Sequence, residues 1–107
     1  MSINQLVIET LETLNVPVSF QKYQGNETTY ITFFQYSENG YLFSDDNEEQ
    51  TRYFIQVDVW SKNDYMDLVE DVKNALENNG FKRLNLTHLY ETDTQIYHCA
   101  IRFSYVN

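Results

Sequence analysis

Three side chains near the C-terminal end of the sequence could supply nucleophilic chemistry: Cys99, its neighbour His98, and His88. A thiol acts as a nucleophile when a nearby base takes its proton. Neighbouring residues of a strand point to opposite faces, so His98 and Cys99 form no dyad by themselves, and His88 would need a matching strand register. Cys99 is in phase with apolar neighbours, which favours a buried cysteine. The alternative to a buried, unreactive Cys99 is a small cytosolic enzyme or ligand-binding domain that uses these three residues.

Metal chemistry is not indicated either by the histidines or by the acidic segment 44–50, SDDNEEQ. Two histidines with one cysteine match no zinc spacing, and the carboxylates lack the alternation of a calcium-binding loop. The three glycines are too dispersed for a phosphate-binding loop. We therefore expect no metal, no cofactor and no enzyme activity. The segment is expected to form a projecting acidic loop, either solvated or used for interaction, and its charged residues are Asp45, Asp46, Glu48 and Glu49.

The segment 52–81 is the part of the chain around which these groups must be arranged. Residues 52–61 alternate strictly, which predicts a half-buried strand. One face carries Tyr53, Ile55, Val57 and Val59, and the other carries Phe54, Gln56, Asp58 and Trp60. The apolar spacing then becomes helical from position 65. Ser61 and Asp64 match a capping box at the helix start, and Gly80 suits its end.

The remaining segments predict one more helix and several strands. The helix covers residues 2–14, with Ser2 and Gln5 as a second capping box. The strands are expected at 18–23, 28–36, 41–43, 81–90 and 95–106, with a turn at 37–40. The fold class is therefore α+β, in one domain over residues 1–107: a mostly antiparallel four- to five-stranded sheet with two helices packed on one face.

Charge and composition exclude several classes of partner. The formal net charge is −9 and Lys82-Arg83 is the only basic pair, so base readout of nucleic acid and binding to an anionic membrane are not expected. No apolar run approaches the length of a bilayer span. A single cysteine and the absence of a signal-like N-terminus make a cytosolic protein the expectation.

A surplus of aromatic side chains is expected on the sheet face that points away from the helices. We call this surface the aromatic face, and its residues are Tyr30, Phe34, Tyr36, Phe54, Asp58 and Trp60. Large apolar patches rich in Tyr and Trp usually mark protein contacts, so this face predicts self-association or partner binding. The alternative is a larger intramolecular core. If a second subunit covers Phe54 and Trp60, Asp58 should find a cation or amide there, because a buried unpaired carboxylate is costly.

The order of segments resembles a known family. The chain has a short N-terminal helix, a first strand PVSFQKYQG, a strand ending in VDVW, a helix ending in NNGF, and a closing hairpin YETDTQIYHCAIRFSYVN. Over nearly its whole length this pattern resembles the small tail-completion, or tail-terminator, proteins of long-tailed bacteriophages and prophages. None of the matching residues is catalytic.

The resemblance implies a structural virion protein that is assembled in the bacterial cytoplasm. Such proteins form a ring, typically hexameric, at the head-proximal end of the tail. The ring ends polymerisation of the tail-tube protein and presents a surface to the head-completion protein. The aromatic face and the acidic segment are the candidate contact surfaces, since a closed ring uses two different patches per subunit. Head-tail connector proteins of the same viruses, and a stand-alone bacterial adaptor, remain alternatives.

Overall fold

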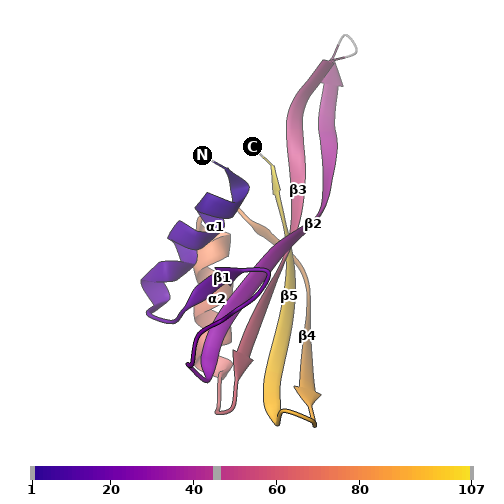
Figure 1. The fold of residues 1–107 in the computed structure, drawn as a ribbon. Coiled ribbons are helices and arrows are strands. Elements are labelled where there is room, and N and C mark those ends of the chain that lie inside the picture. Colours follow the sequence, from indigo (N-terminus) through magenta and orange to yellow (C-terminus); the bar gives the residue numbers. More distant parts are fainter. Residues whose placement is uncertain (1, 45–46, 107) are drawn as a thin grey trace.

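The protein is built from one sheet and two helices (Figure 1). The computed structural model describes the backbone of residues 2–44 and 47–106, and the side chains of residues 2–38 and 50–106. In chain order the elements are α1 (Ile3–Leu11), a 3-10 turn η1 (Glu12–Leu14), β1 (Val18–Phe20), β2 (Thr29–Ser44), β3 (Asn47–Ser61), α2 (Met66–Asn78), β4 (Lys82–Glu91) and β5 (Ile96–Val106).

The strands follow the order β1-β2-β3-β5-β4 across the sheet. The pair β1–β2 is parallel, and the other three neighbouring pairs are antiparallel. A mostly antiparallel sheet with two helices confirms the predicted α+β fold. The central pair joins β3 to β5, with Val57 opposite Ile101 and Val59 opposite Cys99.

The hydrophobic core lies between the helices and one face of the sheet. Both helices lie on the same side of the sheet in Figure 1. The fully buried core side chains include Val7, Leu11, Ile31, Phe33, Ile55, Val57, Val59, Val72, Leu76, Cys99, Ile101 and Phe103. The alternation predicted for residues 53–59 is confirmed, because its apolar members face α1 and α2. Burial of such side chains is the main favourable term in folding.

The helix ends confirm Gly80 and the Ser2 half of the first capping box, while the Gln5 side chain bonds to Glu9 instead of completing that box, and they correct the second box. Ser2 Oγ accepts a hydrogen bond from the Gln5 backbone N–H at 3.1 Å, and Gly80 has a φ of +93°, as expected after a helix. The predicted Ser61–Asp64 capping box is wrong. Ser61 Oγ accepts from Asn63 N, whereas Asp64 Oδ1 accepts from Met66 N, both at 3.0 Å. The helix begins at Met66, so Ser61 lies too far upstream to cap it.

The hairpin of β2 and β3 is longer than predicted. Residues 37–40 form no turn, since β2 passes through them with a register shift between Gln35 and Ser37. Residues 37–44 instead pair along β3 with residues 47–54. The acidic segment 44–50 is not a loop throughout, because β3 already includes Glu48 and Glu49. Asp45 and Asp46 lie outside the described residues.

The far half of this hairpin extends past the rest of the sheet. Arg52 of β3 pairs with Val106, the last residue of β5, so residues 47–51 have only β2 as a neighbouring strand in the described chain. We call residues 39–44 and 47–51 the arm. Figure 1 shows it rising beyond the helices, and the molecule measures 52 × 25 × 23 Å.

Candidate functional site

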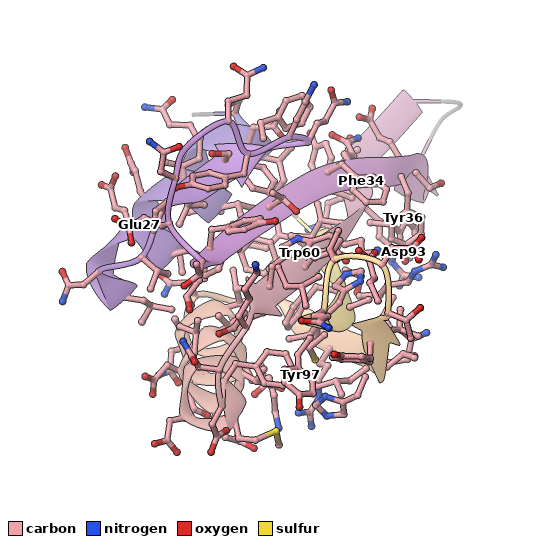
Figure 2. All side chains as sticks on the ribbon, turned by 60° about the horizontal axis from the view of Figure 1, so that its bottom comes forward. Glu27, Phe34, Tyr36, Trp60, Asp93 and Tyr97 are labelled. Carbon is pink, nitrogen blue, oxygen red and sulfur yellow. The ribbon has the colours of Figure 1, made fainter. Side chains whose placement is uncertain are left out.

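The aromatic face lies on the side of the sheet opposite the helices, as predicted. Tyr30 is paired with Trp60 across β2 and β3, while their neighbours Ile31 and Val59 are paired in the core. Side chains alternate along a strand, so Tyr30 and Trp60 point away from the helices. Figure 2 labels Phe34, Tyr36 and Trp60 on this side. In that view Trp60 lies between Glu27 of the β1–β2 connection and Asp93 of the β4–β5 turn.

Four rings form a continuous stack across this face. Tyr23 stacks on Tyr30 with ring centroids 4.2 Å apart, and Tyr30 stacks on Trp60 at 6.1 Å. Trp60 in turn stacks on His98 at 3.8 Å, with the two planes only 10° apart. The Trp60 indole N–H donates to Thr32 Oγ1 at 2.9 Å, which fixes the ring in the plane of the stack. The stack therefore joins β2, β3, β5 and the segment after β1.

Asp58 is satisfied within its own chain. The residue is 5% exposed, and its carboxylate accepts hydrogen bonds from His98 Nε2 at 2.6 Å and from Gln56 Nε2 at 2.9 Å. A buried carboxylate requires such partners, because desolvation without them is costly. Asp58 therefore needs no partner from a second subunit, and the expectation of such a partner where Phe54 and Trp60 are buried against a neighbour stays a prediction. His98 stands 40 residues away in the sequence and is brought opposite Trp60 by the β3–β5 register.

Arg102 extends the network towards the arm. Its Nε donates to Gln56 Oε1 at 3.1 Å, and its guanidinium lies 4.6 Å from the centre of the Tyr36 ring. Tyr36 also contacts Phe54, with 5.9 Å between ring centroids. Cation–π geometry of this kind is favourable. Most of the aromatic face is thus held by contacts inside the chain, and Tyr36 keeps 36% of its surface exposed.

The predicted nucleophile is buried. Cys99 is fully buried in the core under the helices, whereas His98 lies on the aromatic face, so the two point to opposite sides as expected. Burial, and to a lesser degree the negative charge of Asp58, raises the pKa of the Cys99 thiol to about 11. A thiol with that pKa carries almost no thiolate at neutral pH, and the thiolate is the reactive form.

His88 is the register partner of Cys99 on the neighbouring strand β4. Its Nδ1 instead shares a hydrogen bond with the hydroxyl of Tyr65 at 2.8 Å. Burial raises the pKa of that tyrosine, so the hydroxyl stays protonated at neutral pH. In the described part of the chain, no three His, Cys, Asp or Glu side chains lie together in a way that could hold a metal ion.

A second apolar surface was not predicted. It lies where α2 begins, beside the β4–β5 hairpin, and includes Met66 (48% exposed), Tyr90 (50%) and Tyr97 (46%). Tyr90 and Tyr97 contact each other with 4.9 Å between ring centroids, and Tyr65 lies 6.1 Å from Tyr97. Alternation correctly assigns Tyr97 to the helix side, but α2 begins only at Met66, so this end of β5 stays uncovered.

The edge strand β4 is also more exposed than its sequence suggests. Leu86 is half-buried and every other residue from Lys82 to Glu91 is exposed. Leu84 and Leu89 are 44% and 48% exposed. The strand order of the sheet causes this exposure, and a strand order cannot be read from one strand's residues.

The fold is that of an α+β protein, and the features that stand out on it are exposed aromatic and apolar surfaces. A comparison with models of known protein families gives no match, and a comparison with curated proteins gives none either. Neither helix in the described ranges is long and apolar enough to cross a bilayer.

Proposed function

We propose that this chain is a structural subunit of a phage or prophage tail. It assembles as a ring at the head-proximal end, ends polymerisation of the tail-tube protein and offers the surface for head joining. The observation that carries the proposal is the arm, which leaves the body of the sheet and lies away from the helices (Figure 1). An isolated two-stranded ribbon is marginally stable in water, so a projecting ribbon is explained best by a neighbour that it contacts.

The resemblance of the sequence to tail-terminator proteins supplies the identity of the assembly. The buried Cys99, with its pKa of about 11, argues against the enzyme alternative because it was the only candidate nucleophile. The aromatic face contributes less to subunit contact than its composition suggests, since Asp58 and Trp60 already have partners. Several exposed aromatic and apolar groups remain for contacts. They are Tyr36, the surface of Met66, Tyr90 and Tyr97, and also Phe20, Leu84 and Leu89.

Deletion of the gene from its phage or prophage tests this proposal. The expected result is full heads and unjoined tails of uncontrolled length. Supplying the chain in trans should correct both defects. Tails of normal length that fail to join heads would assign the chain to the connector class instead. Normal joined virions would refute the proposal.

A matching measurement uses the purified chain with purified tail tubes. Negative-stain images should show a ring on one end of each tube, and tubes with the ring should stop growing when tube protein is added. Continued growth from both ends would contradict the proposal.

A further inference from the structure

The arm leaves the body of the sheet shortly after an irregularity in β2. Residues 54–55 of β3 are consecutive, yet their partners in β2 are Ser37 and Gln35, so Tyr36 is an extra residue. An extra residue in one strand is a β-bulge, which bends that strand and increases its twist. The arm begins at residue 39, and Figure 1 shows it diverging there from the end of β5. The bulge is therefore placed to set the direction of the arm.

On the aromatic face, the bulge residue is held by a chain of side-chain contacts. The Arg102 guanidinium of β5 lies 4.6 Å from the centre of the Tyr36 ring, and Arg102 Nε donates to Gln56 Oε1 at 3.1 Å. Gln56 Nε2 in turn donates to Asp58 at 2.9 Å, and Asp58 is bonded to His98 at 2.6 Å. Asp58 and His98 are both buried. The chain of contacts thus joins the bulge to a fixed part of the sheet.

On the helix side, a second contact spans the same bulge. Gln35 Nε2 donates to Glu38 Oε1 at 3.0 Å, and these two residues lie on either side of Tyr36 in the sequence. Gln35 is paired with Ile55 and Glu38 with Tyr53, both of which belong to the helix-facing set of β3. The bulge is therefore held from both faces of the sheet.

The length of the arm amplifies any change at the bulge. At about 3.4 Å per residue, the segment 39–44 spans about 20 Å. A rotation of about 10° at the bulge would therefore move the far end by about 3–4 Å. Side chains are in contact only when their heavy atoms approach within about 4–4.5 Å, so such a movement is enough to break contacts at the far end.

We propose that Tyr36, Arg102 and Gln56 form a latch that fixes the direction of the arm, and that the arm turns about the bulge when the latch opens. Tyr36 keeps 36% of its surface exposed and Arg102 is exposed, so the latch can open without disturbing the core. The inference concerns the chain by itself. It does not depend on what the arm contacts or on the proposed function.

The distance between a label on the arm and a label on the body tests the latch. Spin labels are attached to cysteines introduced at Asn47 of the arm and at Glu9, an exposed residue of α1. Cys99 stays unlabelled, because it is fully buried and burial raises the pKa of its thiol to about 11. An excess of unlabelled chain removes distances between copies. Pulsed electron paramagnetic resonance should then give a single narrow distribution of distances for the chain with the latch intact.

Opening the latch should broaden this distribution. In Arg102→Ala the fraction of molecules outside the main distance should rise about two- to fivefold, which corresponds to the loss of an exposed cation–π contact. Gln56→Ala should act in the same direction, because Arg102 then loses its anchor. Arg83→Ala is the matched control: it removes an exposed arginine of β4 that lies 3.6 Å from Glu77, and it should leave the distribution unchanged.

Substitutions of Tyr36 separate the latch from a general loss of packing. Tyr36→Phe keeps the ring and should keep the narrow distribution, whereas Tyr36→Ala should broaden it as Arg102→Ala does. Fluorescence of Trp60 reports whether the body of the sheet stays folded in each variant. A broad distribution with the latch intact, unchanged distributions in Arg102→Ala and Tyr36→Ala, or equal broadening in Arg83→Ala would each overturn the proposal. All three results leave the proposed function standing.

Discussion

His98→Ala should lower the free energy of unfolding by about 3–4 kcal/mol, although His98 lies on the face away from the core. The substitution removes the 2.6 Å hydrogen bond to Asp58, which is 5% exposed. A hydrogen bond to a charged group contributes about 1.5–3 kcal/mol, and the loss of one partner of a buried pair lies at or above that range. Gln56 stays bonded to Asp58 in the variant, so the carboxylate keeps one partner and the loss from this hydrogen bond stays within the range of about 1.5–3 kcal/mol.

The total of about 3–4 kcal/mol includes the ring stack. His98 lies 3.8 Å from Trp60 at an interplanar angle of 10°, and such a pair contributes about 0.5–1.5 kcal/mol beyond its buried area. For a chain of this size a loss of 3–4 kcal/mol corresponds to a fall in Tm of roughly 15 °C. Trp60 is the only tryptophan, so its fluorescence reports directly on this part of the sheet.

Urea unfolding at low protein concentration, followed by fluorescence and circular dichroism, measures the effect. Asp58→Ala and the double variant D58A/H98A complete a cycle, and the coupling energy should be about 1.5–3 kcal/mol. Gln5→Ala is a suitable control, because its side chain makes only an exposed contact to Glu9. A loss below about 1 kcal/mol for His98→Ala, or coupling close to zero, would refute the conclusion that Asp58 is stabilised within its own chain.

Two further predictions concern the core and a helix end. Stability should fall between about pH 9 and pH 11, because the unfolded thiol of Cys99 ionises near 9.0 while burial raises its folded pKa to about 11. The unfolded chain then loses the proton first, which lowers the free energy of unfolding by about 2–3 kcal/mol in total. Urea unfolding across this pH range measures the decrease. The Cys99→Ala chain, whose tyrosines still titrate, should show no such step. Gly80→Ala should lower the free energy of unfolding by about 1 kcal/mol, measured by thermal unfolding, because a residue with a Cβ atom disfavours the φ of +93°. An unchanged Tm would contradict that explanation.

The elements with a strong local pattern could be predicted from the sequence. Alternation in residues 53–59 identifies the buried side of β3, because burial on one face imposes a period of two on the sequence. The apolar stripe of α2 and the helix-ending Gly80 are local signals in the same way. Burial of Cys99 follows from its phase with Ile101 and Phe103.

The errors and omissions arose where distant parts of the chain decide the structure. Ser37, Asn39 and Gly40 are typical turn residues, yet pairing along β3 extends β2 through them. The partner of Asp58 depends on the register between β3 and β5, which no short window contains. Exposure of β4 depends on the strand order, and exposure of Tyr97 depends on where α2 begins.

The length of the arm can change without a change in the packing of the core. Only the base of the hairpin contacts β5, so residues can be added to both strands without altering the core. Each residue added to both strands lengthens the hairpin by about 3.4 Å. Additions in twos keep every side chain on its original face, since a shift of one residue exchanges the faces. A chain with this body could therefore meet neighbours at different distances through changes in hairpin length alone.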